Sequence, residues 1–146
     1  RARGLDPRSR TLAGETGPAT PDEAMALGLA PGARVVRLRR LRYAGDAPLA
    51  LERSAVPAFA LAGARGVRDS LYAALDRRGM RPRRALQRLR AVAFDAEAAR
   101  LLGVEPGSAG LLIERRGFLA DGRAVELTFS HYRGDAYDFV AELKAD

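Results

Sequence analysis

The sequence predicts an α/β fold of the α+β type, in which helices pack on a mostly antiparallel sheet. Three observations carry this prediction: an internal repeat, two β-hairpin patterns, and short helices with recognisable ends. The chain has 146 residues, of which 47% are hydrophobic, so it can bury one core but is short for two domains. We therefore expect a single domain over residues 1–146.

The internal repeat is found when the chain is compared with itself. Residues 3–8 (RGLDPR) match residues 78–83 (RGMRPR), and residues 27–32 (LGLAPG) match residues 102–107 (LGVEPG) at the same offset. Two matches at one offset indicate a duplication. We therefore expect two βαββ halves that are related by a pseudo-twofold axis.

Each half is expected to contain a strand, a helix and a hairpin in that order. The strands are expected at 9–15 and 84–94, the helices at 21–27 and 96–102, and the hairpins at 33–43 with 48–56 and at 109–120 with 123–133. Between the halves, a helix over 70–78 is expected behind the N-cap Asp69, and a last strand over 137–143 closes the chain. The helices are expected on one side of the sheet.

Polar and glycine residues mark the ends of the two repeated helices. Thr20 and Asp95 are expected N-caps, because their side-chain oxygens can accept from the first free backbone N–H groups. Pro21 suits the first helical position. Gly28 and Gly103 follow the last helical residues, where a left-handed conformation commonly ends a helix.

The first hairpin carries charges on a face that should be buried. Side chains alternate along a strand, so Arg40 and Arg42 continue the apolar row of Val36 and Leu38. A three-residue loop would place Arg40 opposite Glu52, whereas a two-residue loop would send Glu52 to the other face. We expect the three-residue loop, because it gathers two guanidiniums and a carboxylate beside an apolar row. Such a group suits an anionic small molecule.

The second hairpin repeats this arrangement. It is expected to turn on residues 121–122, Asp-Gly, as a type I′ turn. Glu126 and Tyr132 share one face, opposite a row that ends in Arg115 and Gly117. The missing side chain at Gly117 is expected to leave room for a ligand opposite Glu126.

Composition narrows the classes of function. The 25 basic and 18 acidic residues give a net charge of +7, but the basic residues are spread along the chain, and neither a recognition helix nor a stacking platform is visible. The chain has no cysteine and a single histidine, His131, which is expected on the surface, so neither a metal nor a cofactor is predicted. The sequence shows neither a long apolar run nor a signal-like start, so we expect a cytoplasmic protein without membrane contact.

A series of motifs follows in one order along nearly the whole chain: LGLAPG at 27–32, VVRLRRLR at 35–42, PLALERSAVP at 48–57, SLY at 70–72, LGV at 102–104, VE at 125–126 and SHYRGDAY at 130–137. This series resembles the effector-binding (UTRA) domain of GntR-type transcription regulators of the HutC subfamily. The resemblance implies a chorismate-lyase-like fold, a homodimer, and a small effector, such as a sugar phosphate or another acidic metabolite, that alters operator affinity. Carried over residue by residue, the resemblance places the effector site on Arg40, Arg42, Glu52, Ser70, Glu126 and Tyr132.

Each candidate residue also has a plain structural interpretation. Arg40 and Arg42 could pair only with Glu52 and surface carboxylates, since exposed ion pairs are common. Ser70 could simply begin a helix, and Tyr132 could be a core tyrosine with a satisfied hydroxyl.

Two other functions stay open beside the sensing domain of a repressor: a chorismate-lyase-like enzyme, and a dimerisation module with a degenerate pocket. The enzyme is disfavoured because no nucleophile–base pair is visible and His131 falls on the face opposite Tyr132. The intact polar residues disfavour the second. Family members carry a winged helix-turn-helix domain upstream, and no such pattern precedes Arg3, so operator DNA is expected to be bound only by a domain outside this sequence.

Overall fold

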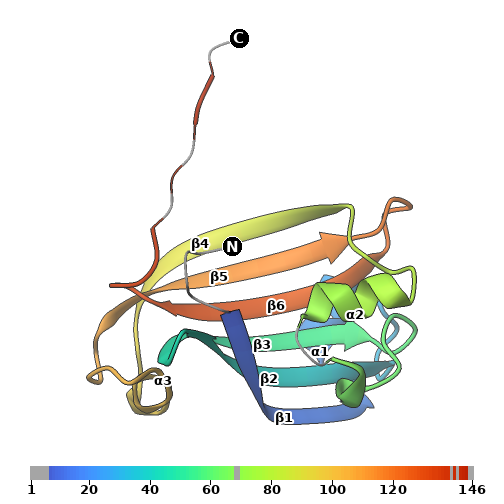
Figure 1. Ribbon diagram of the computed structural model, residues 1–146. Coiled ribbons are helices and arrows are strands. Elements are labelled where there is room, and N and C mark those ends of the chain that lie inside the picture. Colours follow the sequence, from blue (N-terminus) through green and yellow to red (C-terminus); the bar gives the residue numbers. More distant parts are fainter. Residues whose placement is uncertain (1–6, 68–69, 139, 141, 145–146) are drawn as a thin grey trace.

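The computed structural model describes residues 7–67, 70–138, 140 and 142–144, and its centre is one six-stranded antiparallel sheet (Figure 1). The strands are β1 (Pro7–Pro18), β2 (Arg34–Ala44), β3 (Ala47–Pro57), β4 (Arg84–Ala93), β5 (Ala109–Phe118) and β6 (Ala124–Arg133), in the spatial order β1-β2-β3-β6-β5-β4. The pairing of β3 with β6 joins the two halves, so the two hairpins lie side by side in the middle. The predicted α+β fold and the repeated βαββ order are confirmed.

Three short helices and one 3-10 turn connect the strands: α1 (Pro21–Leu27), η1 (Ala64–Gly66), α2 (Leu71–Arg77) and α3 (Ala96–Leu102). Thr20 and Glu23 form a reciprocal capping box, and the Asp95 side chain caps α3. Gly28 and Gly103 end their helices with φ values of 64° and 71°. None of the described helices is long and apolar enough to span a membrane.

The helix between the halves begins one residue later than expected. Its N-cap is Ser70, whose Oγ accepts from the backbone N–H of Ala73 at 3.2 Å. The expected cap, Asp69, lies outside the described residues. Ser70 therefore has the structural role of an N-cap, and its part in effector binding stays a prediction.

The helices cover both faces of the sheet, and the expectation of one side is wrong. Helix α2 packs Leu71 and Leu75 against Val36, Leu38 and Val56, on what we call the α2 face. Figure 1 shows α2 in front of the sheet.

The opposite side of the sheet, the α1/α3 face, carries the alternate residues of the same strands. Leu27 of α1 packs with Val35, and Leu102 of α3 packs with Leu41 and Leu51. The hairpin strands therefore need apolar residues on both sides. Because both faces of the sheet are apolar, each face needs a helix to cover it, and the helices are therefore divided between the two faces.

The first hairpin has the expected register but reaches it in a different way. Arg40 lies opposite Glu52, which confirms the prediction. The turn has only two residues, Gly45 and Asp46, and the pairing shifts by one position so that Leu49 has no partner. This β-bulge restores the side that a two-residue turn would have reversed.

The second hairpin does not turn as type I′. Among the described non-glycine residues none has a positive φ, so Asp121 cannot take the first position of that turn; Gly122 has a φ of 93°. The N–H of Leu119 donates to the carbonyl of Arg123 at 2.8 Å, and the N–H of Gly122 donates to the carbonyl of Leu119 at 2.9 Å. The loop is therefore wider, with glycine at its left-handed position.

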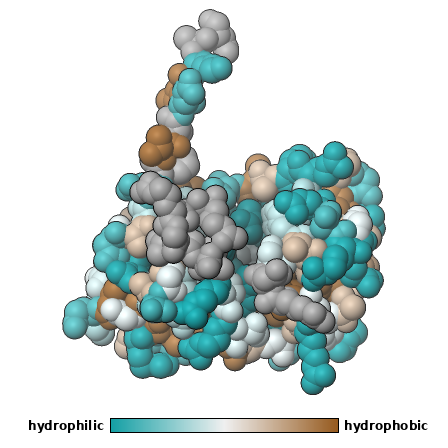
Figure 2. Space-filling model, in the orientation of Figure 1, coloured by the Kyte–Doolittle hydropathy of each residue, from teal (hydrophilic) through white to brown (hydrophobic). Residues whose placement is uncertain are grey.

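Among the residues that the structure describes, the expected last strand is not formed. Residues 137, 138, 140 and 142–144 are not paired in the sheet, and residues 139 and 141 lie outside the described part. This segment runs away from the sheet, and hydrophobic residues are visible along it (Figures 1 and 2).

Candidate functional site

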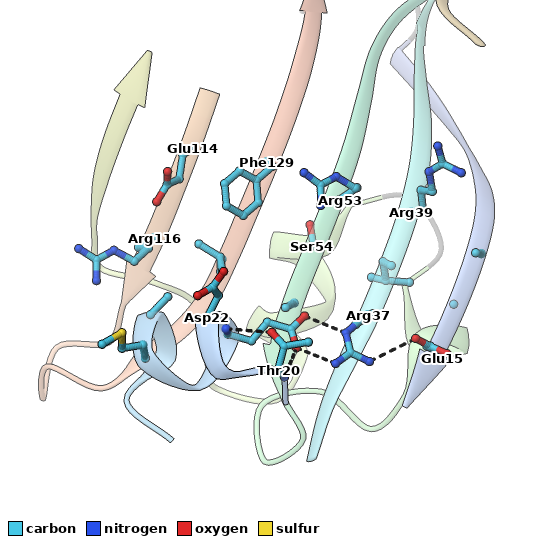
Figure 3. Close-up of a pocket in the computed structure, with 18 residues that line it drawn as sticks. Glu15, Thr20, Asp22, Arg37, Arg39, Arg53, Ser54, Glu114, Arg116 and Phe129 are labelled. Carbon is cyan, nitrogen blue, oxygen red and sulfur yellow. Dashed lines mark hydrogen bonds and ion pairs between the residues drawn. The ribbon is translucent and has the colours of Figure 1, made fainter. Parts of the chain in front are cut away.

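The larger cavity of the domain lies on the α1/α3 face, beside α1, and has a volume of about 990 Å³. Its central side chain, Arg37, is held by Glu23 at 2.6 Å and by Glu15 at 3.2 Å (Figure 3). The hydrogen bond to Arg37 lowers the pKa of Glu23. Arg39 pairs with Glu97 of α3 at 3.2 Å. The ion pairs of these two arginines link α1, α3 and the edge strand β1 to the middle of the sheet. None of the six predicted site residues lines this cavity.

A smaller cavity of about 200 Å³ lies on the α2 face, where the two hairpins meet the start of α2. It is lined by Arg40, Arg42, Glu52, Ser54, Ser70, Leu71, Tyr72, Arg115 and Thr128. The structure therefore brings four of the six predicted residues together here. The volume is below the roughly 300–1,000 Å³ of pockets for drug-sized ligands, so the cavity suits the charged end of a small metabolite.

Arg40 and Arg42 share one carboxylate. Arg40 Nη2 lies 3.7 Å from Glu52 Oε1, and Arg42 Nη1 lies 3.5 Å from Glu52 Oε2. Both distances exceed the roughly 2.7–2.9 Å of a strong charge-assisted hydrogen bond. Arg40 is only 6% exposed, and the Nε of Arg42 is buried without a hydrogen-bond partner among the described residues. Two guanidiniums therefore lie beside one shared carboxylate in a partly buried place.

Glu126 lies behind the cavity wall and does not line it. Its exposed fraction is 0%, and its carboxylate accepts from Tyr72 Oη at 2.7 Å, Arg115 Nη2 at 2.6 Å and Thr128 Oγ1 at 2.6 Å. Side chains of β5, β6 and α2 thus converge on one acid, and Thr128 links it to β3 because Thr128 also bonds Ser54 at 2.9 Å. In this structure Glu126 orients other side chains toward the cavity.

Tyr72 and Arg115 are cavity residues that were not among the predicted six. Burial and the nearby Glu126 raise the pKa of Tyr72 to about 12, so its hydroxyl remains a neutral donor. Burial opposes the charge of Arg115, but the hydrogen bonds and charge of Glu126 outweigh it and raise the pKa of the guanidinium. Sequence features could have pointed to both as site residues. Arg115 continues an apolar strand row, and Tyr72 ends the SLY motif that begins at Ser70.

The sequence predicts room for a ligand at Gly117, and the structure shows that this prediction is wrong. A Cβ there would lie 2.7 Å from Glu126 Oε1 and 2.9 Å from Pro82 Cγ. The space opposite Glu126 is therefore filled by its own carboxylate and by the proline ring.

Tyr132 lies on the α2 face outside the cavity lining. Its ring packs on Tyr137 with a centroid distance of 4.7 Å, and burial raises the pKa of its hydroxyl, with a further contribution from Glu52. His131, on the opposite face, is half-buried near Phe94 and not on the surface; burial lowers its pKa. The ring of Phe94 thus lies next to a histidine that the sequence places on the surface.

Comparisons with known proteins agree on one family. The family model described as "UTRA domain" matches residues 2–138. The HTH-type transcriptional repressor NagR of Bacillus subtilis is 36% identical over 96% of this chain and 59% of its own length, and the HTH-type transcriptional repressor PhnF of Mycolicibacterium smegmatis is 34% identical over 86% of this chain and 54% of its own length. The chain thus spans little more than half the length of these relatives.

Solved structures show the same fold. The effector domain of PhnF from Mycobacterium smegmatis matches with a TM-score of 0.90 and 31% identity, covering 99% of this chain and 91% of that one. A GntR-family transcriptional regulator from Enterococcus faecalis matches with a TM-score of 0.84 and 25% identity, covering 92% of this chain and 99% of that one. The chain therefore belongs to the UTRA domain family, whose domains occur in GntR-type transcriptional regulators.

Proposed function

We propose that this domain binds a small anionic metabolite in the α2-face cavity and that the regulator containing it couples this binding to operator affinity. The observation that carries the proposal is the charge of the cavity lining, in which three arginines, Arg40, Arg42 and Arg115, accompany one carboxylate, that of Glu52. Guanidiniums gathered in a partly buried cavity favour a bound anion, because the anion offsets their positive charge and accepts charge-assisted hydrogen bonds.

The roles of the site residues follow from their positions. Arg40 and Arg42 bind the acidic group, and Glu52 accepts a ligand hydroxyl while it orients both arginines. Ser70 offers its hydroxyl at the start of α2. Tyr132, which lies outside the cavity lining and next to the Tyr137 ring, would contact a ligand that extends beyond the cavity.

Glu126 acts indirectly in this proposal. It holds the Tyr72 hydroxyl and the Arg115 guanidinium in place, and these two side chains reach the cavity. A third guanidinium suits a group with two negative charges, such as a phosphate monoester, better than a single carboxylate.

The regulator is proposed to act as a homodimeric repressor in the cytoplasm, with operator DNA bound by a separate domain. Relatives named transcriptional repressors support this part. The cavity arrangement suits reversible binding, since its described lining contains neither histidine nor cysteine that could act as a catalytic base or nucleophile.

Isothermal titration calorimetry tests the ligand and the site together. The domain is titrated with phosphorylated sugars, with carboxylated sugars and with the same sugars unmodified, after native mass spectrometry has been used to look for a retained metabolite. We expect binding of an anionic member, weakened about ten- to a hundredfold by Arg40→Ala or Arg42→Ala, since a charged hydrogen bond contributes about 1.5–3 kcal/mol.

The matched control is Arg39→Ala, because this arginine pairs with Glu97 on the opposite face. Its removal should leave binding unchanged. Equal losses from Arg39→Ala and Arg42→Ala, or binding of the neutral sugars alone, would contradict the proposed site.

A further inference from the structure

The larger cavity, on the α1/α3 face, takes no part in the proposed binding of an anion. Its volume of about 990 Å³ lies within the roughly 300–1,000 Å³ of pockets for drug-sized molecules. Figure 3 shows side chains of β2, β3, β5 and β6 along its floor and helix α1 at one end. The cavity is therefore large enough for a small molecule of its own.

Two rows of side chains cross the floor of this cavity. In one row, Arg53 of β3 lies opposite Phe129 of β6, which in turn lies opposite Glu114 of β5. In the next row, Ala55 of β3 lies opposite Leu127 of β6. Residues directly opposite each other share one side of a sheet. The floor is therefore apolar along β6, with a positive charge on one side of it and a negative charge on the other.

Helix α1 adds an apolar wall at the end of this floor. Met25 and Ala26 both line the cavity, and Met25 is 83% exposed. The methionine side chain is unbranched and flexible, so it can pack against apolar groups of different shapes. An apolar ligand lying over Leu127 and Phe129 would remove Met25 from water and gain the free energy of that burial.

Arg53 is oriented by an aromatic ring and not by an acid. Its Cζ lies 5.1 Å from the centroid of the Phe129 ring, and it forms no ion pair with another residue of the described part of the chain. Stacking covers a face of the guanidinium and leaves its in-plane N–H groups free to donate to a carboxylate. Arg37 and Arg39 differ, because carboxylates of the chain already hold them.

Glu114 provides the opposite charge on the far side of Phe129. Two strand spacings separate β5 from β3, so the Cα atoms of Glu114 and Arg53 are about 10 Å apart. Within the described ranges, no ion pair involves Glu114. A molecule that lies over Phe129 can therefore place a carboxylate at Arg53 and an ammonium group at Glu114.

The balance of charges distinguishes this cavity from the one on the α2 face. The α2-face cavity has three arginines and one carboxylate in its lining, so it favours an anion. The α1/α3-face cavity is lined by equal numbers of basic and acidic residues: Arg37, Arg39, Arg53 and Arg116 with Glu15, Asp22, Glu23 and Glu114. A lining without a surplus of either charge favours a molecule that carries both.

We propose that the α1/α3-face cavity binds an apolar zwitterion, the chemistry of an α-amino acid with a large apolar side chain. Its carboxylate accepts from Arg53, its ammonium group donates to Glu114, and its side chain lies over Leu127 toward Met25. This site is separate from the effector cavity, and the proposal does not depend on the anionic effector.

Four probe molecules test the chemistry of the ligand. L-phenylalanine carries both charges and an apolar ring, phenylpropionate lacks the ammonium group, phenylethylamine lacks the carboxylate, and glycine lacks the apolar side chain. In NMR titrations, phenylalanine should bind about tenfold or more tightly than each of the others and should shift the backbone amide signals of Leu127 and Phe129. Equal binding of phenylpropionate, or of glycine, would overturn the proposal.

Variants test which residue holds which group. Arg53→Gln should weaken phenylalanine binding by about tenfold and leave phenylethylamine binding unchanged, because that probe has no carboxylate to lose. Glu114→Gln should likewise weaken phenylalanine binding and leave phenylpropionate binding unchanged. The matched controls are Arg100→Gln and Glu105→Gln, which change the same charges at exposed residues that line neither cavity. Equal losses from the controls would overturn the assignment of the site.

A free amino acid and a short peptide share this chemistry, and a comparison of leucine with the dipeptide leucyl-leucine distinguishes them. Tighter binding of either one supports the site and names its source. The same dipeptide with its amine acetylated and its carboxylate amidated should not bind, and binding as tight as that of the free dipeptide would overturn the proposal. So would the absence of binding by both phenylalanine and leucyl-leucine. Anion binding at Arg40 and Arg42 is measured separately, so each proposal can fail alone.

Discussion

Glu126 illustrates how one buried residue determines the positions of several others. It is fully buried and is surrounded by donors from Tyr72, Arg115 and Thr128. A buried carboxylate is tolerated only when such partners replace water. Its position also depends on a residue without a side chain, because the backbone of Gly117 lies directly opposite.

Gly117→Ala is expected to destabilise the domain by about 1–3 kcal/mol, since the new methyl would overlap Glu126 or Pro82 and force a shift in a packed region. Chemical denaturation followed by circular dichroism measures this. Gly66→Ala is the matched control, because a Cβ there meets no atom within 4 Å. Similar stability for both variants would contradict this expectation, because it would show that Glu126 and Pro82 can move to accommodate the methyl group.

At the scale of elements, α2 links the cavity to the middle of the sheet. Its N-cap, Ser70, lines the cavity, and Tyr72 in its first turn donates to Glu126 of β6. The same helix packs Leu71 and Leu75 into the core. A ligand that binds at Ser70 would therefore contact a helix that already packs against the first hairpin and is hydrogen-bonded to the second.

The link through Tyr72 predicts a pH dependence. The pKa of Tyr72 is raised from 10.0 to about 12, so its contribution to stability is fully present below pH 10. Between pH 10 and 12 the unfolded chain loses this proton while the folded chain keeps it, so stability falls. Tyr72→Phe should be less stable than the parent at neutral pH, and the difference should shrink across this range in denaturation curves. A difference that is constant with pH would contradict the link to Glu126.

The whole molecule carries a net charge of +7, and this charge alone predicts some affinity for DNA. In the described part of the chain, strands separate all three helices, so no two helices form a helix-turn-helix. Charge-driven binding releases counterions and therefore weakens steeply with salt.

We expect this domain to bind any DNA sequence weakly, and to lose that binding when salt is raised from about 50 to 200 mM. Fluorescence anisotropy measures the affinity of the domain for an operator duplex and for a scrambled duplex of equal length. Tight binding to one sequence that survives the higher salt would contradict the assignment of operator recognition to another domain.

The sequence by itself determined the features that depend on neighbouring residues. The bounds of α1 and α3 follow from cap residues, and the side shared by Arg40 and Arg42 follows from strand alternation, so both were predictable. Only the tertiary structure decided which face α2 covers and which side chains surround Glu126. Tyr72 and Arg115 meet this acid from separate elements, and such contacts depend on how distant segments pack, which local patterns do not specify.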